Sequence, residues 1–214
     1  MTTHVVVIGA SGFGRECLDV LDAMVAAGAD LRVLGVVDDA IAEVNVERLA
    51  ARGVPFLGTR AAWLATDPGP VAYVLGIGSP GVRRRLVAEL DAVGLRPFTA
   101  IHPSATFGAK VVLDEGVVVC AGAAVSNNVR LGRHVHVNPN ATIGHDADLR
   151  DFVSINPAAV ISGEVVVGSA TLVGAAATVL QGLTVGERTV IGAGAVVTKS
   201  VPSDVVVVGV PGRW

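Results

Sequence analysis

With 214 residues, the chain is long enough for one large or two modest domains with a sizeable buried core. Hydrophobic residues make up 51% of it but aromatic residues only 4%, and 26 glycines accompany the aliphatic side chains, which excludes a disordered chain and favours thin, repetitive packing. The formal charge of −3 and the scattered Lys and Arg residues provide no basic surface for nucleic acid.

The termini and cysteines bear on the compartment. No apolar run reaches the roughly 18 residues of a membrane span, and the opening MTTHVVVIGASGFG lacks the charged segment of a signal peptide. Cys17 and Cys120 lie in apolar segments of different context, which argues against a disulfide between them. We therefore expect a protein of the reducing cytoplasm without a membrane partner.

Residues 4 to 94 alternate short apolar runs with segments of helical periodicity. The pattern predicts strands over 4–9, 31–38 and 71–78, and helices over 14–27, 59–65 and 80–94. Strands that alternate with helices form a small parallel sheet with helices on its faces, as in a Rossmann-like α/β domain. We assign residues 1–100 to this domain.

Ligands of such sheets bind at the carboxyl ends of the strands. The end at 9–14 reads GASGFG and opens a helix, so its backbone N–H groups suit a phosphate, although the order is not the strict G-x-G-x-x-G of a dinucleotide site. The next end supplies Asp38 and Asp39, which either accept hydrogen bonds from a ribose or base or form an ordinary acidic turn.

The third strand end, GIGSPG, leads into the helix over 80–94. Ser79 is the predicted N-cap of this helix, and Pro80 occupies its first position. The run Arg83, Arg84 and Arg85 is predicted to form a solvated helix face.

The pattern changes at Ile101, where every sixth residue becomes apolar. Seventeen consecutive positions follow this rule: Ile101, Phe107, Leu113, Val119, Val125, Leu131, Val137, Ile143, Leu149, Ile155, Ile161, Val167, Val173, Val179, Val185, Ile191 and Val197. A period of six is neither helical nor that of a single strand, and it is typical of a parallel β-helix built from hexapeptides. Residues 101–214 are therefore predicted to form a left-handed β-helix with a C-terminal cap.

In the left-handed form, three hexapeptides complete one triangular coil, so each residue stacks on the residue three hexapeptides further along. We expect the apolar residues to point inward, glycines to help the chain turn at the corners, and the first domain to cover the end near residue 101. The sides carry no loop insertion, and their exposed strand backbones suit side-by-side packing in a homotrimer.

Several motifs, in order, carry a family resemblance over essentially the whole chain: GASGFG, VVDD, GIGS, IHPSA, IGHDADLRDFVSINP, ISGEVVVG, IGAGAVVTKSVP and GVP. They resemble the sugar O- and N-acyltransferases of the sialic acid O-acetyltransferase type, which include UDP-N-acetylbacillosamine and perosamine N-acetyltransferases. The resemblance implies an acetyl-CoA-dependent homotrimer that acetylates the amino group of a nucleotide-linked amino-deoxy sugar.

The GHD motif carries the catalytic pair of the family. The resemblance assigns the general base to His145 and the acid that raises its basicity to Asp146. A neutral imidazole whose other nitrogen is held by a carboxylate is suited to accept a proton from an attacking amine or hydroxyl. Sequence neighbours on a strand point to opposite faces, so Asp146 need not contact His145 of its own chain. Gly163, one full coil after His145, leaves space beside the imidazole.

The resemblance also implies binding positions. The matching acetyl-CoA positions, in a groove between neighbouring solenoids, are Ser154, Gly163, Ala175 and Ala193. The matching nucleotide-sugar positions are Ser11, Gly12, Phe13, Asp38, Asp39 and Gly78. Several relatives carry histidine where Ser154 stands, some carry histidine at Phe13, and asparagine often stands in place of Ser79.

Alternative hypotheses remain open at this stage. O-acetylation of a sugar hydroxyl is the nearest of them, and a non-catalytic, sugar-nucleotide-binding trimeric scaffold belongs to another class. The glycine-rich loop and Asp38 also suggest an NAD-linked enzyme, but the repeat region offers no hydride chemistry. His134 and His136 invite a zinc site, as in trimeric β-helices of the gamma-type carbonic anhydrase kind, yet the histidine spacings do not resemble that family's pattern, and no metal is expected. If His145 is not the general base, it is simply a surface histidine at a corner of the solenoid.

Overall fold

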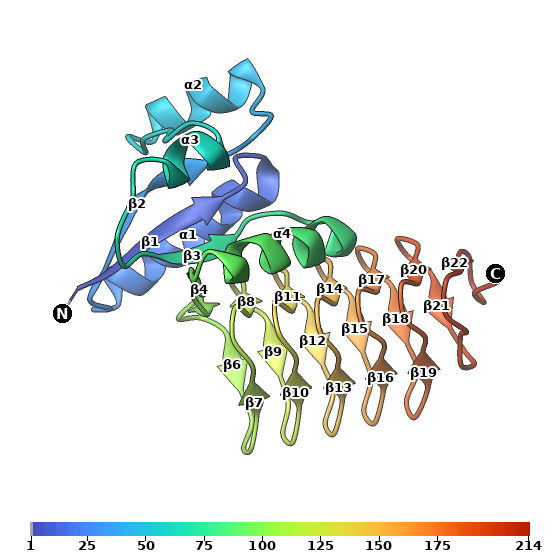
Figure 1. The fold of residues 1–214 in the computed structure, drawn as a ribbon. Helices are drawn as coiled ribbons and strands as arrows, with labels where there is room; N and C mark the ends of the chain where they lie inside the picture. Colours follow the sequence, from blue (N-terminus) through green and yellow to red (C-terminus); the bar gives the residue numbers. More distant parts are fainter. Residues whose placement is uncertain (1) are drawn as a thin grey trace.

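The computed structural model describes residues 2–214. Its first part is a four-stranded parallel sheet in the order β2-β1-β3-β4, made of β1 (Thr3–Ile8), β2 (Leu31–Val37), β3 (Ala72–Leu75) and β4 (Arg96–Pro97). Four helices follow or connect these strands: α1 (Gly12–Ala26), α2 (Glu43–Ala51), α3 (Arg60–Leu64) and α4 (Pro80–Ala92) (Figure 1). The predicted small parallel sheet with helices is confirmed.

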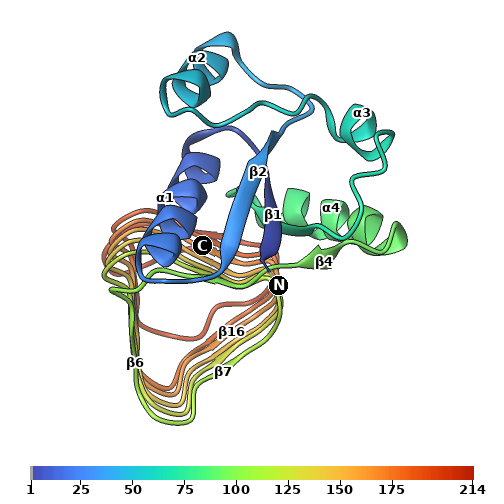
Figure 2. The same ribbon diagram turned by 90° about the vertical axis from the view of Figure 1, so that its left-hand side faces the viewer.

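The central strand β1 is buried on both faces. Val5 and Val7 pack in one core with α1, whereas Val6 and Ile8 pack in another with α3 and α4. This division follows from the alternation of side chains along a strand. Figure 2 shows α1 on one side of the sheet and α3 and α4 on the other.

The sequence prediction missed α2 and the short strand β4. Helix α2 buries only Leu49, and its Val44 and Val46 are 45% and 38% exposed, so no apolar stripe at helical spacing marks it. The other predicted elements of this region agree with the structure to within three residues at each end.

The second part is a parallel β-helix whose coils contribute one short strand to each of three faces. The seven-stranded face holds β5 (Ala100–Ile101), β8 (Val118–Val119), β11 (His136–Val137), β14 (Ser154–Ile155), β17 (Leu172–Val173), β20 (Val190–Ile191) and β22 (Val206–Val207). The six-stranded face holds β6 (Thr106–Phe107), β9 (Ala124–Val125), β12 (Thr142–Ile143), β15 (Val160–Ile161), β18 (Thr178–Val179) and β21 (Val196–Val197). The five-stranded face holds β7 (Val112–Leu113), β10 (Arg130–Leu131), β13 (Asp148–Leu149), β16 (Val166–Val167) and β19 (Thr184–Val185).

The six-residue repeat specifies the interior of the solenoid. From Val119 onward, each apolar repeat residue is at most 3% exposed and belongs to one continuous core. Strands pair in register with those one full coil away, such as Ile143 with Ile161. The predicted stacking period and inward orientation are therefore confirmed, and the period runs to Val197 without an insertion.

The expected role of glycine at the corners holds at four of them only, Gly116, Gly122, Gly182 and Gly194, whose φ lies between 67° and 73°. From Phe107 to Ile191, the left-handed backbone position falls three residues after each inward residue, and most such positions hold other residues, for example Asn128, Asp146 and Glu164, with φ of 57°, 59° and 60°. The glycines directly after inward residues serve close packing instead: a Cβ at Gly144 would lie 2.5 Å from the backbone of the next coil.

The first domain covers one side of the solenoid and not its end, which corrects the sequence expectation (Figure 2). The outward residues of the first four strands of the seven-stranded face, Ala100, Val118, His136 and Ser154, are at most 1% exposed. Further along the same face, Val190 and Val206 are 39% and 60% exposed. Small and apolar outward residues near the start of this face explain the docking, because Ala100 and Val118 are buried in one hydrophobic core with residues of α1.

Two other sequence expectations concern the cysteines and the C-terminal tail. Cys17 of α1 and Cys120 of the solenoid are free and buried in the shared core at the domain junction. At the far end, Val201 and Val207 of the tail pack onto the last coil. No helix among residues 2–214 is long and apolar enough to cross a membrane.

Candidate active site

His145 lies at a corner of the solenoid, between β12 of the six-stranded face and β13 of the five-stranded face. Its Nδ1 atom is 2.7 Å from Oδ2 of Asp146, and nearly half of each side chain is exposed. The alternation of strand residues does not apply here, because Asp146 occupies the left-handed corner position and belongs to no strand. The two side chains of one chain therefore meet directly.

Asp146 has a second partner, Asn128, which the sequence reasoning missed. Nδ2 of Asn128 donates to Oδ1 of Asp146 at 2.9 Å from the preceding coil. Hydrogen bonds with His145 and Asn128 hold the pKa of Asp146 below its usual range. Because Asn128 precedes Asp146 by one full coil of three hexapeptides, the stacking period contained the signal that would have found it. With Nδ1 held by the carboxylate, Nε2 is the imidazole nitrogen left to act on a substrate.

Gly163 provides the space for the imidazole of His145. A Cβ built on Gly163 would lie 2.5 Å from both Cε1 and Nε2 of the ring, closer than Cβ contacts in real structures. The backbone of Gly163 is not in the left-handed region, so glycine is needed here for the close approach and not for its φ. The stacked pair predicted from the sequence is thus present, with the ring lying over the glycine.

A cavity of about 290 Å³ lies between the first domain and the seven-stranded face. Its lining comes from the start of α1, the loop after β3 and two coils of the solenoid: Gly12, Phe13, Glu16, Gly78, His136, Asn138, Ser154, Asn156 and Pro157. It brings together Gly12, Phe13 and Gly78 of the expected sugar-nucleotide positions with Ser154 of the expected acetyl-CoA positions. Glu16 and the two asparagines had not been singled out as site residues, and His136 had been considered only as a zinc ligand, because only the docked domain places these side chains around one space.

The hydroxyl of Ser154 is engaged within the chain. It donates to the carbonyl oxygen of Gly78 at 3.2 Å and accepts from Nη2 of Arg83 at 3.0 Å, and the residue is 1% exposed. Arg83 is 0% exposed, so the predicted solvated face is wrong for this residue, whereas Arg84 and Arg85 are exposed as predicted. Burial lowers the pKa of Arg83 to about 9.

His134 and His136 are buried at the domain junction. The ring of His134 stacks between Tyr73 and Phe152, and that of His136 lies 4.6 Å from the ring of Phe13. Burial lowers the pKa of both, to about 3 for His134, so both are neutral at pH 7. Within residues 2–214, no group of three or more His, Cys, Asp or Glu side chains is arranged to hold a metal ion.

A second cavity, of about 190 Å³, lies at the carboxyl ends of the first-domain strands, and Gly9, Asp38, Asp39, Arg60 and Ile77 are among its lining residues. The carboxylate of Asp38 accepts from the backbone N–H of Ala10 at 2.7 Å, and that of Asp39 accepts from the backbone N–H of Arg60 at 2.7 Å. The two acids therefore order the loops around the cavity while lining it.

The glycine-rich loop divides into two kinds of glycine. Gly9, Gly14 and Gly76 pack so tightly that a Cβ on any of them would meet the backbone of another. Gly12 and Gly78, the two matched to ligand positions, face open space. Ser11 is the N-cap of α1, yet its side chain makes no capping hydrogen bond, so the first N–H groups of the helix remain available to an anion.

The remaining acetyl-CoA positions lie on a different corner from His145. Ala175 and Ala193 follow β17 and β20, at the corner between the seven-stranded and six-stranded faces, and both are exposed. Gly163 follows β15, at the corner that carries His145. Within one chain, Ala175 and Ala193 are therefore one side of the triangular coil away from Gly163 and His145.

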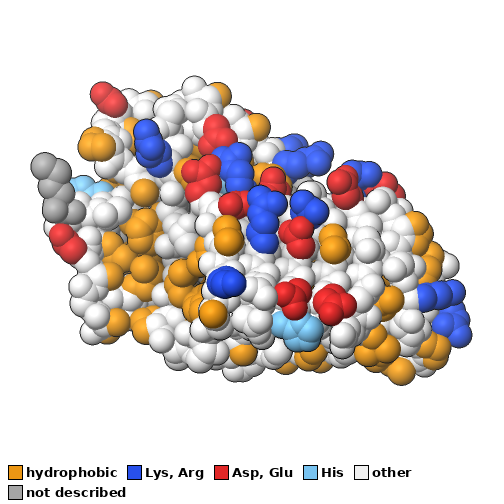
Figure 3. Space-filling view, turned by 90° about the horizontal axis from the view of Figure 1, so that it is seen from below, with side chains coloured by type: hydrophobic (Ala, Val, Ile, Leu, Met, Phe, Trp, Pro, Cys, Tyr) orange, Lys and Arg blue, Asp and Glu red, His pale blue; other side chains and the backbone are white. Residues whose placement is uncertain are grey.

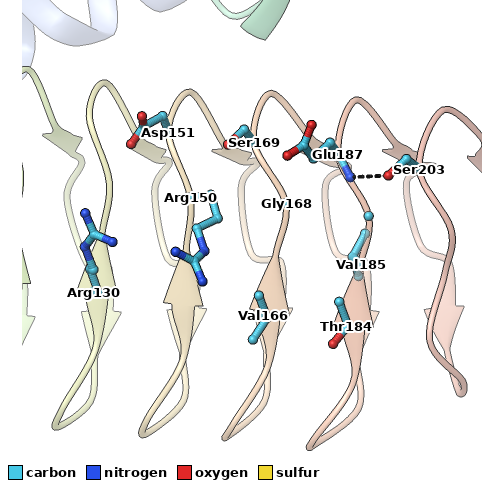
Figure 4. Close-up of a pocket in the computed structure, with 11 residues that line it drawn as sticks. Arg130, Arg150, Asp151, Val166, Gly168, Ser169, Thr184, Val185, Glu187 and Ser203 are labelled. Atoms are coloured by element: carbon cyan, nitrogen blue, oxygen red, sulfur yellow. Dashed lines mark hydrogen bonds between the residues drawn. The ribbon is translucent and has the colours of Figure 1, made fainter.

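A third cavity, of about 600 Å³, opens on the five-stranded face and contains none of the predicted site residues (Figure 4). Arg130 and Arg150 lie along it and pair with Asp114 and Asp148. Figure 3 shows cationic and acidic side chains interleaved along the underside of the solenoid. The charges on this face balance each other, which does not favour an anionic ligand.

Comparisons with known proteins match both parts of the chain. The family model described as the PglD N-terminal domain matches residues 4–90. The curated UDP-N-acetylbacillosamine N-acetyltransferase of Bacillus subtilis (strain 168) is 32% identical over 119 residues, which are 55% of this chain and 51% of that protein. The chain thus matches about half the length of this curated relative.

Solved structures match over the whole chain. A mutant of perosamine N-acetyltransferase from Caulobacter crescentus, in complex with CoA and GDP-perosamine, is 30% identical with a TM-score of 0.86, covering 100% of this chain and 97% of that one. The acetyltransferase domain of PglB from Neisseria gonorrhoeae FA1090, in complex with acetyl coenzyme A, is 29% identical with a TM-score of 0.84, covering 100% and 99%. The predicted left-handed β-helix is confirmed, and the chain belongs to the family of hexapeptide-repeat sugar O- and N-acyltransferases that includes perosamine N-acetyltransferase.

Proposed function

We propose that the protein transfers the acetyl group of acetyl-CoA to the amino group of a nucleotide-linked amino-deoxy sugar, with His145 as general base. The observation that carries the proposal is the imidazole held by Asp146 and seated over Gly163 at an exposed corner. The relatives bound to CoA and GDP-perosamine support the pair of substrates.

The chemistry assigned to the corner is a direct attack. The amine nitrogen attacks the thioester carbonyl while Nε2 of His145 accepts the amine proton. The C–S bond then breaks, and the imidazolium returns that proton to the departing sulfur, so that CoA leaves as the thiol and the imidazole is neutral again. Asp146, held by Asn128, orients the imidazole and stabilises its protonated form. Neither Cys17 nor Cys120 is suited to form an acyl-enzyme, because both are buried and burial raises the pKa of each thiol, to about 12 for Cys120.

Both thiols are also unpaired, which supports the cytoplasm as the compartment.

The sugar nucleotide is assigned to the two cavities of the first domain. The cavity with Asp38 and Asp39 would take the nucleoside, whose ribose and base offer hydrogen-bond donors to carboxylates. The diphosphate would lie at the start of α1, where Ser11 and Gly12 leave backbone N–H groups open. The sugar would then enter the neighbouring cavity beside Phe13 and Gly78.

A homotrimer completes the site in this proposal. His145 and Ser154 lie on different sides of one coil, and a side of six extended residues spans up to about 20 Å. The base would therefore act on a sugar bound to a neighbouring copy. The six-stranded face supports such packing because its outward strand residues are all small or uncharged: Thr106, Ala124, Thr142, Val160, Thr178 and Val196.

The test compares the protein with its His145→Ala variant in a thiol-release assay. Acetyl-CoA is offered with UDP-, GDP- and dTDP-linked sugars that carry either an amino or a hydroxyl group at the same carbon. We expect turnover with an amino sugar only, and a loss of roughly 10²–10⁴ in kcat for His145→Ala, the usual range for general base catalysis. Faster turnover of the hydroxyl sugars would establish O-acetylation, and binding of a sugar nucleotide without turnover would establish a scaffold.

A further inference from the structure

Arg83 of α4 is a fully buried guanidinium at the junction of the two domains. Nη1 donates to the carbonyl oxygens of Ile77 and Gly78, each at 3.0 Å. Nη2 donates to the carbonyl oxygen of Phe152 at 2.7 Å and of Val153 at 3.3 Å. One side chain thus ties the loop after β3 to a corner of the solenoid.

The charge of Arg83 has no acidic partner. Among the described residues, no carboxylate forms an ion pair with it, and its Nε has no hydrogen-bond partner. Burial is the largest influence on its pKa, which stays near 9, so the group is still charged at neutral pH. An apolar residue of similar size would join two domains without the penalty of a buried charge. A role beyond cohesion is therefore indicated.

The acceptors of Arg83 line the cavities assigned to the sugar nucleotide. Ile77 lines the nucleoside cavity, and Gly78 and Ser154 line the cavity between the domains. Ser154 accepts from Arg83 and donates to Gly78, which closes a small network around the loop. The guanidinium therefore fixes the loop and the solenoid face on either side of the space where the two substrates would meet.

We propose that Arg83 is a positioning residue that holds the sugar-nucleotide loop in register with the acyl site. It touches neither substrate and acts through Ile77, Gly78 and Ser154. The planar guanidinium offers five donors in a fixed fork and here bonds acceptors of both domains at once, whereas an ammonium group is a compact point charge with three donors. This inference rests on the proposed function.

Arg83→Met keeps the apolar length of the side chain and removes the fork. Displacing the amine by about 1 Å relative to the thioester costs about 10²-fold in rate. We expect kcat for acetyl transfer to fall about 10²-fold, the KM for the sugar nucleotide to rise, and the KM for acetyl-CoA to stay within about threefold. Arg83→Lys should recover part of the loss in kcat, because it restores the charge and some of the donors.

The experiment measures kcat and both KM values for the protein in its assembled form, per folded site as determined by circular dichroism and light scattering. Arg84→Met is the matched control: it removes an exposed arginine from the same helix and should leave all three constants unchanged. Ser154→Ala and the double variant Arg83→Met/Ser154→Ala complete a double-mutant cycle. The losses in kcat caused by the two single substitutions should be strongly non-additive in the double variant.

A merely structural role predicts a lower melting temperature with kcat and both KM values per folded site unchanged, and this result would overturn the inference. Additive losses in the cycle would do so as well. If Arg83→Met does not fold, the kcat values of Arg83→Lys and Ser154→Ala still test whether Arg83 positions the loop. The absence of acetyl transfer by the unaltered protein would instead refute the proposed function.

Discussion

Gly163→Ala displaces the imidazole of His145 without removing it, and so tests the geometry of the corner. The new Cβ would lie 2.5 Å from Cε1 and Nε2 of the ring, whereas ordinary contact begins at 3.4 Å. The ring must therefore move by about 0.9 Å, the difference between the two distances. The backbone can accept alanine, because Gly163 does not have a positive φ.

The size of the effect follows from this displacement. A catalytic group misplaced by about 1 Å costs about 10²-fold in rate, or about 2.7 kcal/mol in the activation barrier. We expect kcat of Gly163→Ala to fall by about this factor while the KM for the sugar nucleotide changes little, since that ligand is assigned to the first domain. The assay is steady-state release of the CoA thiol across pH 5.5–9 with the preferred acceptor.

The matched control is Gly81→Ala. Gly81 lies in the first turn of α4, and a Cβ there meets no atom within 4 Å, so kcat should be unchanged. If Gly163→Ala turns over within threefold of the parent, then either the ring moves without penalty or His145 is not the base. His145→Ala distinguishes these two, because only the second leaves its activity intact.

Three further predictions concern the acid, the helix start and the buried histidines. Asp146→Asn should lower kcat less than His145→Ala does, because the base remains and only the group that orients the imidazole is altered, and an unchanged kcat would contradict the pairing. The lowered pKa of Asp146 means that the acid itself does not titrate between pH 5.5 and 9, so the loss in kcat should be present across this range. Gly12→Val places a side chain in open space beside the interdomain cavity and should raise the KM for the sugar nucleotide but not for acetyl-CoA, and equal weakening of both ligands would show that the substrates are wrongly assigned. His134 has a pKa of about 3 when folded and an ordinary value of 6.5 when unfolded, so the unfolded chain binds more protons between these values and stability falls as pH drops below 6.5. Denaturant titration should show an unfolding free energy about 2 kcal/mol lower at pH 5 than at pH 7.5 from this residue, and His134→Phe should remove that part of the pH dependence.

The assignment of the fold needed little beyond periodicity. An apolar residue at every sixth position can be buried throughout only if the chain turns once in each hexapeptide, so the repeat specified the solenoid, its stacking register and its core. The same register is sufficient to place Gly163 next to His145, because the two positions are one coil apart. In the first domain, alternating apolar runs and helical segments specified the parallel sheet. Helix α2 was not predicted, because it buries only one side chain and so shows no apolar stripe.

The sequence did not predict contacts between residues that lie far apart along the chain. Corner geometry turns Asp146 toward His145, although strand alternation alone predicts that neighbours point apart. Docking of the first domain on the side of the solenoid buried Arg83 and His136, both of which carry the polar character of surface residues. Local sequence sets periodicity and backbone propensity, because those depend on neighbours along the chain. The depth and partners of a polar side chain depend on which surfaces pack together, and only the tertiary structure decides that.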